Sequence, residues 1–306
     1  MNKKGFISTT TVYSFFLVFL LMLLFIVNNL VSNRTLLNGI KEKIKDEIAI
    51  SSFASYIINE IYTTDGENGL YYHDADLTNG ANDNSYRYSG ANPNNYVCFG
   101  SDATPCPDEY LYRIIGVING KVKIIRNEAI TTRTYTDNNK NDYVTSNLYT
   151  DYLTDEYLNT LGDFKDKIDN NYWYVPSDEE IVNTLTANGV YSLELGENSN
   201  AYGAVYSKVG LLYISDYAYA AAPGDWVKKV NEYNTANNWL KNETNMWTMV
   251  RDFNNIKNFF YIDTSGNVAS GEITNTYSVR PVVVLSNSNR YISGSGSETD
   301  PFIIGG

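Results

Sequence analysis

One segment decides the fold of this chain: Tyr110-Leu111-Tyr112-Arg113-Ile114-Ile115-Gly116-Val117-Ile118-Asn119-Gly120-Lys121-Val122-Lys123-Ile124-Ile125-Arg126. Its first half is mostly apolar and rich in β-branched residues, which favour strands. Asn119-Gly120 is a dipeptide that two-residue hairpin turns prefer, because both central residues of such a turn take positive φ. Polar and apolar residues then alternate, as on a return strand with one buried face. The segment predicts an antiparallel hairpin within a sheet-based domain.

Further strands are predicted toward the C-terminus. Phe259 to Asp263 and Val268 to Ser270 predict a second hairpin around the turn Ser265-Gly266-Asn267. Tyr277 to Leu285 is typical of one buried strand, but it contains Arg280. A buried guanidinium group needs a carboxylate or several carbonyl groups as partners. We therefore predict that Arg280 is a structural buried charge with such a partner.

Helix and strand signals lie between the two hairpins. Leu148 to Leu161 has amphipathic spacing, which predicts a short helix. Ser177 and Glu180 have the spacing of a capping box, which predicts the start of another helix. Val209 to Ile214 is apolar and predicts a strand. The body is therefore predicted to combine a sheet with flanking helices.

Composition excludes some classes of function. The chain has 306 residues, a formal net charge of −12 and 43% hydrophobic residues. Nucleic-acid binding needs a basic face, and an acidic body is not attracted to anionic lipid. We therefore predict no nucleic-acid partner and no contact between the body and an anionic membrane surface. The 27 tyrosines suit a domain with many half-buried rings, which could bind a glycan or a protein ligand.

The two cysteines are predicted to form a disulfide. Cys98 and Cys106 flank a turn-rich loop, and such pairs are common in exported proteins. The single histidine, His73, is predicted to be a solvated loop residue, because two thiols and one imidazole do not make an ordinary zinc site. The run Asp137 to Asp142 begins like a calcium-binding loop but lacks the required glycine and glutamate. We predict no metal, no cofactor and no catalytic residue.

The N-terminus carries a long apolar stretch, Tyr13 to Val31. No polar residue occurs from Phe15 to Val27, and about 20 such residues span a bilayer. Lys3 and Lys4 precede the stretch, which favours an N-terminus inside and a body outside. We predict a transmembrane segment at about residues 12–31 and a membrane-anchored protein with an extracellular C-terminal domain.

Isoleucines at helical spacing continue beyond this stretch, so one long helix is predicted over residues 6–62. A short basic leader, residues 1–5, ends at the step from Gly5 to Phe6. These features resemble the type IV pilin-like superfamily. The resemblance implies processing after Gly5, with Phe6 as the first mature residue. Most pilins carry a glutamate where this chain has Thr10, which implies a minor or tip subunit with filament subunits as partners; a plain membrane anchor is the alternative.

The motifs of the body resemble a family of exported bacterial domains. In order they are Tyr112–Val117, Tyr213–Tyr217, Trp247–Thr248 and Arg280–Val282, and the likeness covers about residues 85–304. The resemblance implies the C-type-lectin-like fold, a twisted sheet with flanking helices that formylglycine-generating enzymes share. The chemistry of those enzymes needs a late pair of reactive cysteines, and no cysteine follows Cys106. The lectin motifs Glu-Pro-Asn and Trp-Asn-Asp are absent as well.

Together these observations predict an α+β chain. After the leader and the long helix, residues 63–95 form a neck and residues 96–306 an extracellular head with a mixed, mainly antiparallel sheet of C-type-lectin-like fold. The expected function is a non-enzymatic cell-surface protein, a minor pilin-like subunit or adhesin whose head binds a glycan or a protein. Two alternatives are a membrane-anchored extracellular enzyme of formylglycine-enzyme-like fold and a plain membrane-anchored structural protein.

Overall fold

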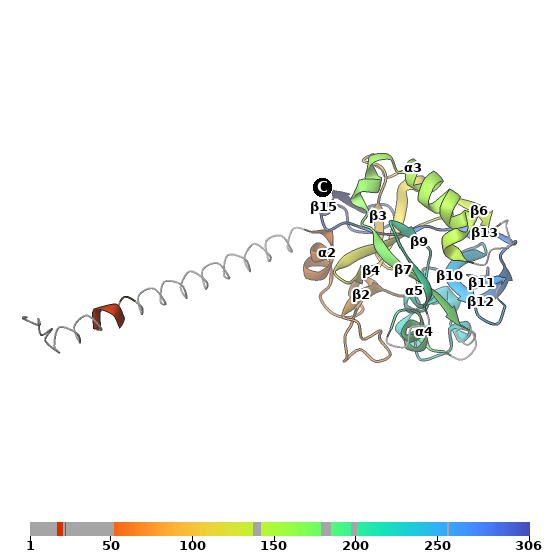
Figure 1. Ribbon diagram of the computed structural model, residues 1–306, viewed down its shortest axis with the longest axis horizontal. Helices are drawn as coiled ribbons and strands as arrows, with labels where there is room; N and C mark the ends of the chain where they lie inside the picture. The colour runs from red at the N-terminus through yellow and green to blue at the C-terminus, as the bar shows by residue number, and fades with distance from the viewer. Residues whose placement is uncertain are drawn as a thin grey trace, which may run out of the picture. The chain divides into compact units, whose positions relative to one another are not determined.

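The computed structural model describes residues 17–20, 22, 52–136, 142–178, 185–196, 201–255 and 257–306. Its contacts divide the chain after Ser51, and residues 52–306 form one unit, which we call the domain. Two β-sheets with short helices around them build the domain (Figure 1).

The first sheet is mixed and has nine strands in the described part of the chain. Its order is β15 (Arg290–Ser293), β16 (Phe302–Gly305), β3 (Tyr96–Cys98), β4 (Leu111–Ile118), β5 (Lys121–Arg126), β14 (Val282–Val284) and β9 (Val209–Gly210), with β1 (Leu70–His73) on β2 (Ser85–Tyr88) and β2 on β4. β5 runs along one edge of β4, while β3 and β2 lie end to end along the other. β16 and β3 are parallel. The stretch predicted as a neck, residues 63–95, therefore contributes β1 and β2 to this sheet.

The second sheet is also mixed, with seven strands among the described residues. Its order is β12 (Val268–Glu272), β11 (Asn258–Ile262), β10 (Met246–Asp252), β13 (Thr276–Val279) and β6 (Thr131–Thr134), with β7 (Asn171–Asp178) on β10 and β8 (Ala201–Ser207) on β7. β13 and β7 lie end to end along one edge of β10, and both are parallel to it. β7 and β8 are antiparallel, and the segment between them in sequence contains α4 (Ala187–Glu194).

Both predicted hairpins are confirmed. β4 and β5 are antiparallel, and Asn119 and Gly120 at their turn have φ of 52° and 71°. β11 and β12 form the second hairpin. Gly116 explains how β2 reaches β4, since a Cβ atom at Gly116 would lie 2.2 Å from the carbonyl oxygen of Tyr86. Only glycine permits that approach.

The predicted single strand from Tyr277 to Leu285 is two strands, one in each sheet. β13 ends at Val279 in the second sheet, and β14 begins at Val282 in the first. Pro281 has no backbone N–H to donate, so the hydrogen-bond ladder of one sheet cannot continue through it. The chain changes sheets at this proline.

The described helices of the domain are short. Its α-helices are α2 (Phe53–Tyr56), α3 (Leu158–Thr160), α4 (Ala187–Glu194) and α5 (Ile214–Ala220). The π-helices are η1 (Ile57–Ile61) and η5 (Leu148–Tyr157). The 3₁₀ turns are η2 (Glu67–Gly69), η3 (Asp108–Tyr110), η4 (Tyr143–Thr145), η6 (Gly162–Lys167), η7 (Pro223–Asp225), η8 (Val230–Glu232) and η9 (Thr235–Asn237).

Two of the shorter predictions are corrected by these helices and strands. Ser177 lies in β7, because it pairs with Arg251 of β10, so it does not start a helix. The strand predicted from Val209 stops at Gly210, and Ile214 is the first residue of α5. The helix predicted from Leu148 is present as η5 followed by α3.

The predicted fold class is wrong, because no long N-terminal helix is seen in the described residues. The helix was expected over residues 6–62, most of which lie outside them. Ser52 has an extended backbone (φ −82°, ψ 153°), and its side chain accepts a hydrogen bond from the N–H of Ser55. A residue in this conformation begins a new helix instead of continuing one. The described chain is built mostly from two mixed sheets with short helices.

The first helical turn belongs to the domain. Phe53 is 1% exposed, and its N–H donates to the carbonyl oxygen of Asn289 over 2.7 Å. The ring of Tyr56 stacks on that of Tyr291 of β15, with centroids 3.7 Å apart. Figure 1 shows α2 beside β15 accordingly. The isoleucine stripe assigned to a stalk is thus partly a core-facing stripe, with Ile57 fully buried.

The membrane predictions are also corrected. The segment at about 12–31 lies outside the described residues except for 17–20 and 22, as do Gly5, Phe6 and Thr10. In the part of the chain that the structure describes, no helix has the length and apolar character needed to cross a bilayer. The predicted anchor and the predicted membrane-attached location of an extracellular domain are therefore not supported, and the membrane as a partner stays a prediction.

Candidate functional site

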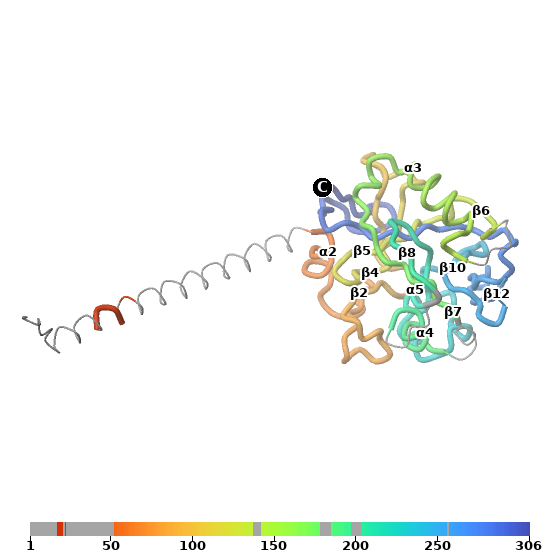
Figure 2. Tube along the Cα trace, viewed as in Figure 1, coloured from red at the N-terminus to blue at the C-terminus, as the bar shows by residue number. Residues whose placement is uncertain are grey.

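A pocket of about 460 Å³ opens where the two sheets and two helices meet. We call it the Lys123 pocket. Its polar and aromatic lining comes from β2 and the loop before it, from β5 and the turn before it, from β7, from α4 and from the N-cap residue of α5. The residues are Asp83, Arg87, Asn119, Lys121, Lys123, Asn171, Tyr172, Trp173, Tyr174, Tyr191 and Tyr213. Figure 2 shows α4, α5 and β7 on the same side of the domain. The pocket thus draws on elements far apart in sequence.

Lys123 lies at the floor of the pocket. Lys121 and Lys123 share one face of β5, because side chains alternate along a strand. Lys123 is 6% exposed, and its Nζ donates to Asp216 Oδ2 over 2.5 Å. The ring centroids of Tyr213 and Trp173 lie 4.7 Å and 5.7 Å from the same Nζ. A carboxylate and two aromatic rings therefore hold this ammonium group.

Arg87 of β2 forms the second charged group of the floor. Its guanidinium donates to Asp83 Oδ2 over 2.7 Å and to Ser85 Oγ over 2.9 Å. Its Nη1 lies 3.6 Å from Asp216 Oδ1, so one carboxylate, on α5, faces both cations. Arg87 is 1% exposed, and its Cζ lies 5.4 Å from the ring centroid of Tyr191.

Glu194 joins the two helices behind this floor. It is the last residue of α4, and its two carboxylate oxygens accept hydrogen bonds from the N–H groups of Ile214 (2.9 Å) and Ser215 (2.8 Å) at the start of α5. Glu194 is fully buried. Since Tyr191 lies one turn earlier on α4 and Asp216 follows Ser215, this contact fixes both walls of the pocket.

Burial and pairing shift the pKa values of these groups. Burial raises the pKa of Glu194 to about 7 and outweighs the hydrogen bonds from Ser215 and Ile214. Burial also lowers the pKa of Lys123, although Asp216 opposes the shift. For Asp83, burial alone would raise the pKa, but the charge of Arg87 and bonds from Ser85 and Arg87 prevail and lower it to about 2.

Exposed tyrosines form the rim. Tyr172 and Tyr174 of β7 are 61% and 43% exposed. Tyr206, the cross-strand partner of Tyr172 on β8, has its ring centroid 4.9 Å from that of Tyr172. The backbone of Tyr174 is held in place by the hydroxyl of Tyr213, which donates to its carbonyl oxygen over 2.9 Å. Aromatic area is therefore exposed beside a rigid, charged floor.

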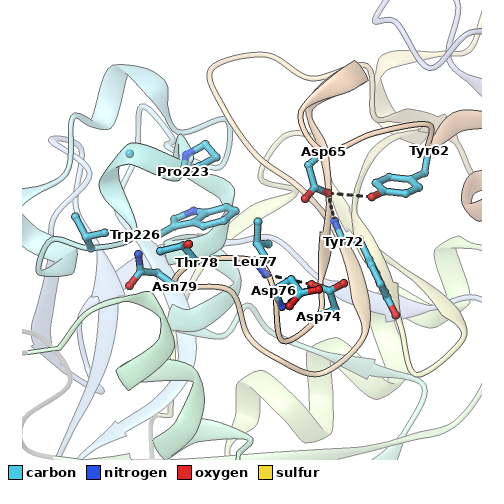
Figure 3. A pocket seen from close by; sticks show the side chains of 12 residues that line it. Tyr62, Asp65, Tyr72, Asp74, Asp76, Leu77, Thr78, Asn79, Pro223 and Trp226 are labelled. Carbon is cyan, nitrogen blue, oxygen red and sulfur yellow. Dashed lines mark hydrogen bonds between the residues drawn. The ribbon is translucent and has the colours of Figure 1, made fainter.

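A second hollow, which we call the acidic cleft, has a volume of about 570 Å³. Figure 3 shows Asp65, Asp74 and Asp76 on one side and Pro223 and Trp226 on the other. Two of these carboxylates, those of Asp65 and Asp74, accept hydrogen bonds from residues at most seven positions away. Asp65 Oδ1 accepts from the hydroxyl of Tyr62 (3.1 Å) and the N–H of Tyr72 (2.8 Å), and Asp74 Oδ1 accepts from the N–H groups of Asp76 (3.0 Å) and Leu77 (3.1 Å).

The described residues among the predicted sites, Cys98, Cys106 and Arg280, line neither hollow, and Gly5 and Phe6 lie outside the described residues. Cys98 and Cys106 form a disulfide with a Cα–Cα distance of 5.8 Å. Arg280 is 3% exposed and donates to the backbone carbonyl oxygens of Arg126 (2.8 Å) and Leu240 (3.4 Å). Its partners are thus carbonyl groups, and burial lowers its pKa to about 10.

His73 does not lie in a solvated loop. It is fully buried at the end of β1, where its Nδ1 accepts from the N–H of Ala81 over 3.0 Å. Burial and the charge of Arg87 lower the pKa of His73 to about 3, so the imidazole is neutral near pH 7. Among the residues that the structure describes, no three His, Cys, Asp or Glu side chains gather in a way that could hold a metal ion.

Sequence reasoning missed the lining residues Arg87 and Lys123 and the buried carboxylates behind them, Asp216 and Glu194. A signal was present at Lys123 and Asp216, because each is a charge inside a mostly apolar run. Comparison of the chain with protein-family models, with curated proteins and with solved structures finds no significant match. The pilin-like and C-type-lectin-like resemblances therefore remain predictions from the motifs.

Proposed function

We propose that the domain is a non-enzymatic carbohydrate-binding domain whose ligand occupies the Lys123 pocket. A volume of about 460 Å³ lies within the range of small-ligand pockets, roughly 300–1,000 Å³. The rings of Tyr172 and Tyr174 at the rim are exposed, and the amides of Asn119 and Asn171 contribute to the lining. Rings pack against the C–H faces of a sugar, and amides bond to its hydroxyl groups.

The observation that carries this proposal is an exposed aromatic rim above a floor of paired charges. Arg87 pairs with Asp83, and Lys123 with Asp216. Lys123 donates to Asp216 over 2.5 Å and lies against the rings of Trp173 and Tyr213, so its Nζ is already bound within the protein. Such a floor orients a ligand without reacting with it.

The enzyme alternative has less support. Chemistry of the formylglycine-enzyme type needs reactive cysteines, and both cysteines of this chain are in one disulfide. Glu194 has a pKa of about 7, which would suit an acid or base, but it is fully buried and both its oxygens accept backbone N–H groups. It is therefore a support of the pocket and not a group that meets a ligand.

A glycan array probed with the purified full-length chain tests the proposal. We expect binding to a defined set of saccharides, with no change in the saccharide after long incubation. A double variant, Tyr172→Ala with Tyr174→Ala, is expected to bind at least about tenfold more weakly, because rim rings supply much of the contact. Both side chains are exposed, so the variant should fold normally.

The matched control is Phe253→Ala, which removes an equally exposed ring (60%) that does not line the pocket. This variant should bind like the wild type. Absence of binding to every saccharide, or equal binding by the double variant, would refute the proposed function. Conversion of a bound saccharide would overturn its non-enzymatic part.

A further inference from the structure

The charge of the Lys123 pocket differs from that of the chain. Its lining includes three cations, Arg87, Lys121 and Lys123, and one carboxylate, Asp83. The whole chain carries a net charge of −12. Each cation is paired with a carboxylate, Arg87 with Asp83, Lys121 with Asp169 and Lys123 with Asp216. The pocket therefore offers the remaining N–H donors of these cations, which favour a ligand group that accepts hydrogen bonds and carries negative charge.

Lys121 lies near the rim of the pocket and Lys123 at its floor. They are two positions apart on β5, so their Cα atoms lie about 7 Å apart on the same face. The side chain of Lys121 is 36% exposed and pairs with Asp169 over 2.7 Å, whereas that of Lys123 is 7% exposed. An ammonium group has three donors, so each lysine can accept a further anionic partner without releasing its carboxylate.

Arg87 has one nitrogen, Nη1, whose hydrogen bond is not completed within the protein. It is 1% exposed and lines the pocket, yet its buried Nη1 makes no hydrogen bond. Asp216 Oδ1, at 3.6 Å, is beyond hydrogen-bond distance and also lacks a hydrogen-bond donor. Nη1 and Oδ1 face each other as an ion pair, and a ligand that tightened this contact, or a water bridging the two atoms, would complete both hydrogen bonds.

We infer that the saccharide of the Lys123 pocket is acidic, with a ring carboxylate that pairs with Lys121 and faces Lys123 while the sugar ring packs against the rim tyrosines. This inference rests on the proposed function and adds the charge of the ligand to it. A carboxylate paired with lysine forms charge-assisted hydrogen bonds, which are stronger than those of a neutral hydroxyl group.

Titration calorimetry with two acidic saccharides, trigalacturonic acid and sialyllactose, tests the inference on the full-length chain. Each is compared with its carboxyl-reduced form, in which the carboxylate becomes a primary alcohol. We expect at least one acidic form to bind about tenfold or more tightly than its reduced form. Its affinity should also fall as sodium chloride is raised from about 50 to about 500 mM.

The variant Lys121→Gln should lose about tenfold in affinity for the acidic form and none for the reduced form. Lys228→Gln is the matched control, because Lys228 is 45% exposed and pairs with Asp225 over 2.6 Å outside the pocket.

Equal binding of acidic and reduced forms would overturn the inference but keep the carbohydrate-binding function. Binding of neither form, with neutral glycans bound on the array, would do the same, whereas binding of no saccharide at all removes both. A glutamate-rich peptide that competes better than either saccharide would assign the pocket to a protein partner.

Discussion

Asp216, the buried carboxylate of the Lys123 pocket, is held in the opposite way to the carboxylates of the acidic cleft. In the acidic cleft, Asp65 and Asp74 accept hydrogen bonds from residues within a few positions in sequence. In the Lys123 pocket, Asp216 meets Lys123 from 93 positions away. The first arrangement is made by a loop and the second by the whole fold.

The difference shows at which carboxylates a loss of charge should lower the stability of the folded chain. A loop carboxylate near water keeps most of its hydration, so its charge hardly matters to folding. A buried carboxylate loses that hydration and depends on partners that the fold supplies. The comparison predicts that a change of charge alone is severe at Asp216, moderate at Glu194 and nearly silent at Asp74.

The largest effect is expected for Asp216→Asn. The substitution keeps the size of the side chain but leaves Lys123 and Arg87 facing a neutral amide. Removal of one partner from a buried ion pair costs about 3–5 kcal/mol, because the remaining charge is uncompensated. Urea denaturation of the full-length chain at pH 7 measures the free energy of unfolding and checks this value.

A second substitution separates charge from packing. Lys123→Met combined with Asp216→Asn removes the stranded ammonium group, and Arg87 keeps its partner Asp83. We expect the double variant to be more stable than Asp216→Asn alone by about 1–3 kcal/mol. If the double variant is the weaker of the two, the loss at Asp216 comes from packing and the comparison between the two hollows fails.

The next effect concerns pH and Glu194. The pKa of this carboxyl is about 7 in the folded chain, against an ordinary value of 4.5. Between about pH 4.5 and pH 7, Glu194 is therefore protonated in the folded state and ionised in the unfolded state. This contribution to stability is fully present below pH 4.5 and is lost as the pH rises through 7. Glu194→Gln should remove the loss, which is on the order of 2–3 kcal/mol.

Thermal unfolding at pH 5 and pH 8 measures the difference between wild type and Glu194→Gln. His73 also makes stability depend on pH. Its pKa is about 3 in the folded chain and 6.5 in the unfolded chain, so its contribution to stability is lost as the pH falls below 6.5. Because His73 is present in both proteins, the comparison cancels it. An identical pH dependence in the two proteins would show that Glu194 does not titrate in this range.

Local signals predicted parts of the fold well. Asn119-Gly120 fixed the β4–β5 hairpin, because only a few dipeptides accept positive φ at both turn positions. The prediction of one long helix was wrong, because isoleucines at helical spacing also occur in the short helices after Ser52, which pack against the core of the domain. The change of sheet at Pro281 could not be predicted, since a proline indicates a break in strand pairing but does not indicate which sheet the next strand joins.

The site could not be predicted, for a physical reason. Alternation on β5 placed Lys123 on the polar face, and a polar face is usually exposed. Here β7, α4 and α5 cover that face, and no local pattern encodes such long-range packing. The prediction that His73 is solvated was wrong for the same reason, because the residues around it have the composition of a loop although the side chain is fully buried.

The smallest effect is expected in the acidic cleft, where two substitutions at Asp74 separate charge from hydrogen bonding. Asp74→Asn keeps an oxygen that can accept from the N–H groups of Asp76 and Leu77, so the free energy of unfolding should change by less than about 0.5 kcal/mol. Asp74→Ala removes the acceptor and should cost about 0.5–1.5 kcal/mol. Urea denaturation of both variants, alongside Asp216→Asn, completes the series. A loss at Asp74→Asn that approaches the loss at Asp216→Asn would mean that the charge of the cleft itself supports the fold, and the contrast between a loop-made and a fold-made hollow would be wrong.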